Sequence, residues 1–276
     1  YDIHVHDVIS TLFTVEFATL NSQSIMQGYT AGQYTNTHTA VIAETQTNRI
    51  IVPTSTANLY RVGQAISAGT TQGGNQIFYG RSITKIEQYD ENNSAIYFDG
   101  NPVDIAVGNM LYNTGWKNGF SRNIAASSGY TVANDGKYPC AYRGIESPWG
   151  DVWQFVDGVN ITDNQAWVAK NANDYTSNVF ASPYEKLGYV NANANGYIKY
   201  MGYDSNLPFA RFPVDVGGSS STYYNDYYYQ NSNQRIAFVG GTWYTGSDAG
   251  LFSWSLSYVS SDVRVSFGGR LLKKAL

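Results

Sequence analysis

Apolar residues near the start of the chain recur at a helical spacing. They lie three or four positions apart and form one stripe, made of Val5, Val8, Ile9, Leu12, Phe13, Phe17 and Leu20. This period predicts an amphipathic α-helix that ends near Gly28, because glycine commonly follows a helix end. Glu16 falls on the same stripe, where burying an unpaired carboxylate would be costly. We therefore expect Glu16 to have a hydrogen-bond partner, and a catalytic carboxylate is the alternative interpretation.

Short β-favouring runs replace this pattern between residues 48 and 114. The runs are residues 50–52, 59–62, 77–79, 83–86 and 95–98. Turn-forming residues separate them, and residues 83–98 predict a β-hairpin. The spacing favours a small antiparallel barrel or sandwich, so we interpret residues 48–114 as an inserted β-module. A spacer, an attachment surface and a second binding face stay open as its role.

The closing stretch, residues 240–270, combines a regular frame with irregular positions. The frame consists of Gly246, Ala249, Gly250, Leu251, Phe252, Trp254, Leu256, Gly268, Gly269 and Arg270. The other positions are small, polar or assorted, and they alternate less cleanly than a strand that only has to pack. We predict that twelve of them bind a ligand: Trp243, Tyr244, Thr245, Asp248, Ser253, Ser255, Ser257, Tyr258, Asp262, Val263, Arg264 and Ser266. By its size, Trp243 also fits the frame, and an ordinary terminal hairpin with polar faces is the alternative.

Composition supports a binding surface and excludes some partners. The chain has 24 tyrosines and 27 glycines, and tyrosine offers rigid contact area at low entropic cost. The same residues also suit a β-rich, loop-rich secreted protein. The net charge of −4 with 14% charged residues argues against nucleic-acid binding. Apolar runs are too short for a membrane span. The first residue is Tyr1 rather than Met, so we interpret the chain as a fragment or processed product.

Few residues suggest chemistry. Cys140 is the one cysteine, so neither an intrachain disulfide nor a thiol-based zinc site can form. The spacing of His4 and His6 fits a metal pair, but no third ligand is near, so we interpret them as a frayed terminus or a satisfied surface pair. We expect no catalytic residue, no metal and no cofactor.

Acidic residues near tryptophans leave two alternatives open. Glu146, Asp151 and Asp157 supply carboxylates for glycoside hydrolysis, a mechanism that is decided by their separation. Asp151, Asp157, Asp163 and Asn160 have the oxygen ligands that calcium prefers, but their spacing matches no known loop. We interpret these four as surface turn residues.

Two segments resemble a known family. Residues 142–160 read YRGIESPWGDVWQFVDGVN, and residues 240–270 open on GGTW and close on GGR. In this order they resemble the formylglycine-generating-enzyme-type branch of the C-type lectin fold, with GDVWQF as a variant of the usual G-N-V-W-E-W. The opening segment, residues 15–30, resembles the start of phage tail proteins that carry this domain with a small β insertion. Enzymes of that branch bind copper through two cysteines, so their activity does not transfer to a chain with Cys140 alone.

The resemblance implies an α+β fold. It comprises a C-type lectin-like domain from residues 1–47 and 115–276, an N-terminal amphipathic helix, and the inserted antiparallel barrel or sandwich at residues 48–114. The closing segment also resembles the variable region of proteins diversified by retroelements. Together these imply a non-enzymatic, extracellular receptor-binding domain or adhesin of a phage tail or other virion part.

The expected partners are a host cell-surface protein or glycan and other virion proteins. A homotrimer stays open, and it would use globular faces because the chain has no coiled-coil heptads. The alternatives are a cell-wall polysaccharide hydrolase and a purely structural virion protein, such as a collar, head fibre or baseplate subunit.

Overall fold

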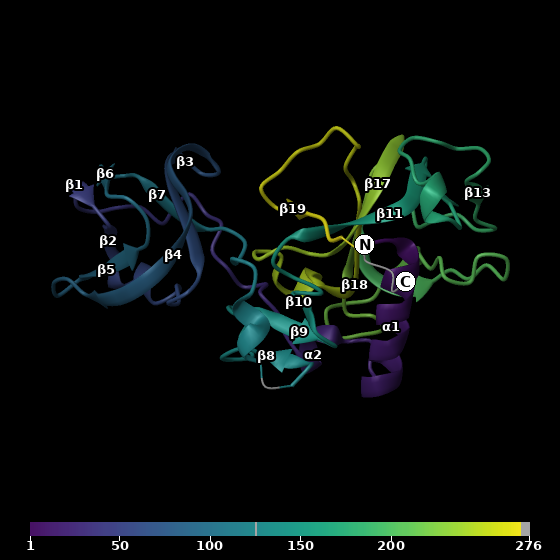
Figure 1. Cartoon of the computed structure of the whole chain (residues 1–276), viewed down its shortest axis with the longest axis horizontal. Coiled ribbons are helices and arrows are strands. Elements are labelled where there is room, and N and C mark those ends of the chain that lie inside the picture. The colour runs from purple at the N-terminus through teal and green to yellow at the C-terminus, as the bar shows by residue number, and fades with distance from the viewer. Residues whose placement is uncertain (125, 272–276) are drawn as a thin grey trace. The chain divides into compact units, whose positions relative to one another are not determined.

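The computed structural model describes residues 1–124 and 126–271 (Figure 1). The fold is mixed α+β, as predicted, and most of its regular structure is strand. The chain forms two compact units, one from residues 1–27 together with the chain from residue 148 onward, the other from residues 28–147. Sequence pattern placed the boundaries at residues 47/48 and 114/115. Residues 28–47 and 115–147 group with the smaller unit because they hydrogen-bond within it, for example Ala40 N to Asn109 O at 2.9 Å and Thr30 N to Gly136 O at 2.8 Å.

The larger unit begins with helix α1 (Ile3–Phe17), which lies where a helix was predicted. Asp2 caps its first turn by accepting a hydrogen bond from Val5 N at 2.9 Å. The helix ends at Ala18, whose left-handed φ of 49° breaks the repeat. A separate turn, α2 (Ser22–Ile25), follows, so the predicted helix does not continue towards residue 28.

The buried face of α1 differs from the predicted apolar stripe. Its buried residues are Ile3, His6, Ile9, Ser10 and Phe13. Val8 and Leu12 are exposed, and so is Glu16, which corrects its predicted burial. Polar groups can face the core here because they are satisfied: Ser10 Oγ donates to His6 O at 2.7 Å, and His6 Nδ1 lies 3.0 Å from Tyr1 OH.

A nine-stranded sheet dominates the larger unit. Along the sheet its strands are, in order, β13 (Glu185–Lys186), β12 (Gln165–Val168), β11 (Trp153–Thr162), β17 (Gln234–Gly240), β18 (Gly250–Leu256), β16 (Tyr227–Gln230), β14 (Gly196–Met201) and β15 (Pro213–Val216). The ninth strand, β19 (Phe267–Gly268), pairs in parallel with β11. Most pairs are antiparallel, whereas β16 and β18 run parallel. Short 3-10 turns, η2 (Ala172–Asp174) and η3 (Gly246–Asp248), interrupt the connections.

Large side chains fill the core between α1 and this sheet. Trp254 is 1% exposed, and its ring lies 4.6 Å from that of Phe212 and 4.8 Å from that of His6. Trp149 is fully buried and donates its indole hydrogen to Met26 O at 2.9 Å. Burying an aromatic side chain of this size stabilises the fold by a few kcal/mol, about 25 cal/mol per Å² of apolar surface.

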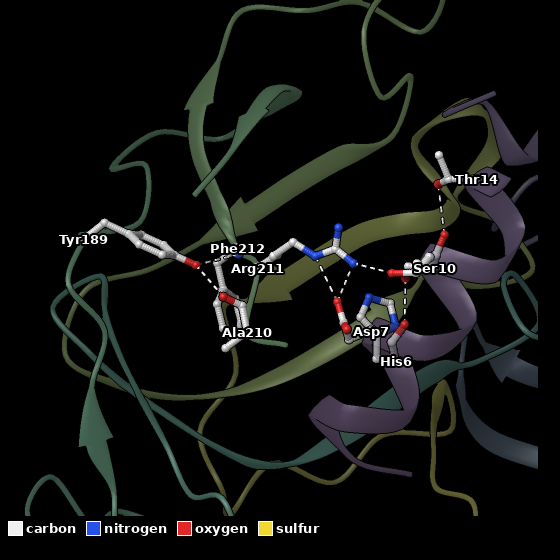
Figure 2. Close-up of polar contacts among 9 residues, drawn as sticks. His6, Asp7, Ser10, Thr14, Tyr189, Ala210, Arg211 and Phe212 are labelled. Carbon is white, nitrogen blue, oxygen red and sulfur yellow. Dashed lines mark hydrogen bonds and ion pairs between the residues drawn. The ribbon is translucent and has the colours of Figure 1, made fainter. Parts of the chain in front are cut away.

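A charged contact ties α1 to the segment before β15 (Figure 2). Arg211 forms an ion pair with Asp7, to which its Nε donates at 2.9 Å, and a second nitrogen donates to Thr11 Oγ1 at 2.6 Å. Tyr189 holds the same segment, because its hydroxyl donates to Ala210 O at 2.8 Å and accepts from Phe212 N at 3.1 Å. These bonds fix the segment that packs Phe212 against Trp254.

The smaller unit contains a five-stranded antiparallel sheet. Its order is β2 (Arg49–Pro53), β5 (Asn93–Phe98), β4 (Gly74–Gln88), β3 (Ala65–Thr71) and β7 (Met110–Asn113). Two smaller sheets pair β1 (Glu44–Thr47) with β6 (Val103–Ile105), and β9 (Cys140–Tyr142) with β8 (Gly129–Tyr130) and β10 (Ile145–Glu146). The remaining short helical turns are α3 (Thr54–Ala57) and η1 (Phe120–Asn123).

The predicted hairpin at residues 83–98 is confirmed. Its strands pair from Ile83 with Phe98 to Gln88 with Ser94. Asp90 closes the turn by accepting hydrogen bonds from Asn92 N and Asn93 N at 2.8 and 2.9 Å. Residues 59–62, predicted as a strand, instead form the turns that follow α3. No helix in the described parts of the chain is long and apolar enough to cross a membrane.

Candidate binding site

Six of the twelve predicted ligand-binding residues line one hollow of about 330 Å³ on the larger unit. We name it the tyrosine hollow; its lining comprises Trp153, Tyr229, Tyr244, Thr245, Asp248, Ser255, Ser257 and Tyr258. Strands β11, β16 and β18, the η3 turn and the segment after β18 each contribute side chains. The hollow therefore depends on strand pairs that are distant in the sequence.

The chain from β17 to η3 is held tightly. Gly240 and Gly241 have φ values of 96° and 83°, which favour glycine. A Cβ on Gly241 would lie 2.5 Å from that of Ala249, so no larger residue fits there. Helix α2 supports the turn, because Gln23 Nε2 donates to Gly246 O at 2.9 Å and to Ala249 O at 2.5 Å.

Two tyrosine hydroxyls orient the carboxylate of Asp248. Tyr197 donates to Oδ1 at 2.5 Å and Tyr229 to Oδ2 at 2.8 Å. Burial raises the pKa of both tyrosines, and their hydrogen bonds to Asp248 raise it further. Both hydroxyls therefore keep their protons at neutral pH. Asp248 is the one charged side chain among the residues that line the tyrosine hollow.

The aromatic side chains that line the hollow pack against one another and against neighbouring residues. The rings of Trp153 and Tyr229 meet edge to face with centroids 6.0 Å apart. Tyr258 packs on Phe267 at 4.7 Å, and the guanidinium of Arg264 lies 5.0 Å from the Tyr258 ring centre. Burial raises the pKa of Tyr258, and nearby Arg264 opposes that rise. Tyr244 is 43% exposed, so its ring is the most accessible anchor of the four.

The remaining predicted residues lie elsewhere. Trp243, Ser253 and Ser266 are buried and do not line the tyrosine hollow, whereas Ser255 lines it although it is only 1% exposed. Asp262 lines a separate hollow of about 330 Å³ with an aromatic floor that includes Phe155, Phe238 and Phe267. Val263 and Arg264 are exposed, and Val263 is 93% exposed.

The predicted frame is buried at its large residues. Ala249, Leu251, Phe252, Trp254 and Leu256 are all at most 6% exposed. Trp243 is 0% exposed, and its ring meets that of Tyr244 edge to face at 5.2 Å. Its burial assigns Trp243 to the frame that supports Tyr244.

Sequence reasoning did not include Trp153, Tyr197, Tyr229 or Gln23 in the site. Trp153 belongs to the tryptophan motif at residues 142–160, and Tyr229 to a run of tyrosines, so both stood out by composition. Pairing of β11 with β17, and of β16 with β18, brings them to the closing segment. No local spacing encodes those pairings.

The candidate carboxylates fall in different units. Glu146 belongs to the smaller unit, where it accepts hydrogen bonds from Gly119 N at 2.7 Å and Ser121 N at 2.8 Å. Asp151 and Asp157 belong to the larger unit. Asp157 accepts from Gly158 N at 2.8 Å, and the carbonyl of Asp151 accepts from Trp243 N at 2.9 Å. These contacts give Glu146 and Asp157 roles in holding the backbone. The prediction of surface turn residues is wrong for Asp151 and Asn160, which are 7% and 2% exposed, and for Asp157, which lies with Asn160 in strand β11.

For His6, neither predicted alternative, a frayed terminus or a satisfied surface pair, is correct. His6 is 5% exposed and faces the core, where burial lowers its pKa to about 3. The ring of His4 stacks on Phe209 at 3.9 Å. His38 is buried in the smaller unit, 2.9 Å from Tyr60 OH. Within residues 1–124 and 126–271, no group of three or more His, Cys, Asp or Glu side chains is placed to hold a metal ion.

No family model matches the chain, and no curated protein matches its sequence.

Proposed function

We propose that this chain is a non-enzymatic recognition domain that binds a host-surface ligand in the tyrosine hollow. The supporting observation is the convergence of six predicted positions of the closing segment with Trp153 and Tyr229 around one hollow. Aromatic anchors beside small hydroxyl-bearing residues are typical of adaptable binding surfaces. A concave site with a few convergent polar groups is also where small ligands bind.

We also propose that the chain is part of a virion. The larger unit would be a C-type lectin-like domain of a phage tail or another surface-exposed virion part, with the smaller unit as its insertion. The resemblance in residues 142–160 and 240–270 supports this assignment. The larger unit combines an N-terminal helix with a large, mostly antiparallel sheet. Other virion proteins would then be its structural partners.

Diversification of the closing segment by a retroelement is part of the same proposal. The large residues of its frame are buried, whereas Tyr244, Val263 and Arg264 are exposed, where substitutions usually change stability little. Sequencing the DNA around the coding region tests this idea. A reverse transcriptase gene beside a near-copy of the codons for residues 240–270 would support it, and the absence of both from the complete source genome would contradict it.

Binding to whole cells tests the recognition role. A fluorescently labelled chain is titrated against intact cells from a panel of Gram-positive and gut bacteria. A double variant, Tyr244→Ala with Ser257→Trp, removes the exposed anchor and fills the tyrosine hollow. The matched control, Tyr203→Ala with Ser205→Trp, makes the same changes at exposed residues of the same unit that do not line the hollow.

The hollow variant should bind the recognised cells at least about tenfold more weakly, a change of about 1.4 kcal/mol. The control should bind like the unmodified chain, and all three proteins should unfold at similar temperatures. Equal affinity of the hollow variant and the control would contradict the proposed site. Failure of the unmodified chain to bind any cell of the panel would contradict the proposed function.

A further inference from the structure

A second hollow, of about 300 Å³, lies beside the first on the larger unit. We name it the amide hollow, because four of its lining residues are the carboxamides Asn21, Gln23, Gln27 and Asn225. Serine hydroxyls and the carboxyl of Asp226 complete its lining. Neither an aliphatic, an aromatic nor a basic side chain belongs to that lining.

The turn η3 forms the wall between the two hollows. Ser247 lines the amide hollow, and the next residue, Asp248, lines the tyrosine hollow. Consecutive Cα atoms are about 3.8 Å apart. The hydroxyl of Tyr197 contacts both residues, at 3.1 Å from Ser247 Oγ and 2.5 Å from Asp248 Oδ1. One extended ligand that crosses this turn would therefore occupy both hollows.

The wall is held in place from the amide side. Gln23 lines the amide hollow, and its Nε2 donates to the carbonyls of Gly246 and Ala249, which flank the wall. Asp226 is 1% exposed and accepts from Phe252 N at 2.7 Å on strand β18. The polar groups of the amide hollow are thus mounted on the same elements that shape the tyrosine hollow.

The lining chemistry narrows the class of ligand. An anion would find no lysine or arginine in the amide hollow, and a divalent cation would find one carboxyl there. A peptide side chain of apolar character would find no apolar wall. Carboxamides and serine hydroxyls both donate and accept hydrogen bonds, as sugar hydroxyls do. The tyrosine hollow adds aromatic faces, against which the C–H face of a sugar ring packs.

We propose that a linear glycan lies across η3, with one sugar ring against the aromatic walls of the tyrosine hollow and the adjoining sugars in the amide hollow. The proposal rests on the tyrosine hollow as the ligand site, and it names the ligand class and a second subsite. A protein ligand is the competing outcome of the test.

The first experiment identifies the ligand class on the cells that bind the chain. Their polysaccharide fraction is extracted, freed of protein with proteinase K, and added as a competitor. The glycan proposal expects this fraction to displace the chain from the cells. If the extract displaces the chain before treatment with proteinase K but not after it, the ligand is a protein. The glycan proposal then fails, whereas the recognition role stands.

The second experiment tests the two-hollow span. Ser220→Trp fills the amide hollow, and Ser221→Trp places the same side chain at an exposed neighbour outside its lining. Affinities are measured for size-separated fragments of the same polysaccharide. The longer fragments should bind the unmodified chain and Ser221→Trp at least tenfold more tightly than the shortest fragment that binds.

Ser220→Trp should lose this advantage of length and keep its affinity for the shortest fragment. Equal dependence on length in Ser220→Trp and Ser221→Trp, or affinity that does not depend on length in the unmodified chain, would overturn the second subsite. Neither of these results changes the cell binding that tests the tyrosine hollow. Failure of the second subsite can therefore be distinguished from failure of the proposed function.

Discussion

The hydroxyl of Tyr229 donates a hydrogen bond to Oδ2 of Asp248 across 2.8 Å, and so joins strand β16 to the turn η3. Tyr197 holds the other carboxylate oxygen from strand β14. The carboxylate that faces the tyrosine hollow is thus pre-oriented by two rings. A pre-oriented group loses less entropy when a ligand binds.

Tyr229→Phe should therefore weaken cell binding by about three- to tenfold, because it keeps the ring and releases one carboxylate oxygen. A hydrogen bond to a charged group contributes about 1.5–3 kcal/mol, of which a part appears in ligand affinity. The titration against recognised cells measures the change, with Tyr203→Phe as the control at a tyrosine that is 68% exposed. Affinities that match for the two variants would show that this bond does not prepare the site.

His6 should make the larger unit less stable in acid. Burial lowers its pKa to about 3, whereas the imidazole of an unfolded chain titrates near 6.5. Below pH 6.5 the unfolded state takes up a proton, whereas His6 in the folded state stays neutral until the pH approaches 3. The free energy of unfolding therefore falls as pH drops from about 6.5 towards 3, by up to about 1.4 kcal/mol per pH unit from this residue. Urea unfolding at several pH values in this range measures that free energy. It should depend less steeply on pH in His6→Gln than in the unmodified chain, and an equal dependence on pH in the two proteins would contradict the prediction.

Asp226 should act in the opposite direction. Burial raises the pKa of its carboxyl well above 3.8, against the hydrogen bonds from Phe252 N and Ser253 N. Its contribution to stability is complete below about pH 3.8 and is lost as pH rises through the raised pKa, because the unfolded chain releases the proton first. Asp226→Asn is neutral throughout, so its stability relative to the unmodified chain should rise from pH 4 to pH 7. A difference that stays constant with pH would refute this.

Trp254 should be critical to the larger unit. Its ring is 1% exposed and packs between Phe212 and His6. Trp254→Ala should lower the free energy of unfolding by about 3–5 kcal/mol through lost burial and the cavity left behind. Tyr203→Ala, at an exposed ring of the same unit, should stay within about 0.5 kcal/mol of the unmodified chain in urea unfolding. A Trp254→Ala loss below about 1 kcal/mol would mean that the core is organised differently.

Local patterns predicted those features that depend on neighbours in the sequence. The hairpin at residues 83–98 follows from a turn signal between two β-favouring runs, and the buried frame of β18 from its large apolar residues. The buried face of α1 was predicted wrongly because hydropathy ranks Val8 above His6. The fold buries His6 nonetheless, since Tyr1 OH contacts Nδ1 and the ring meets Trp254.

The sequence predicted only those residues of the candidate site that belong to the closing segment. Tyr244, Asp248 and Tyr258 lie near each other in the sequence and line the hollow. Trp153 and Tyr229 arrive there through pairing between distant strands, which single-sequence periodicity does not encode. The amide hollow also joins distant residues, since Gln23 follows α1 and Ser247 precedes β18.

Tyrosine nitration on the unmodified chain tests the central claim most directly. Tetranitromethane modifies accessible tyrosines, and mass spectrometry reports the extent at Tyr244 and Tyr203, which are 43% and 68% exposed. An envelope fraction from recognised cells should reduce nitration of Tyr244 severalfold and leave Tyr203 unchanged. Protection of Tyr203 with undiminished nitration of Tyr244 would contradict binding at the tyrosine hollow.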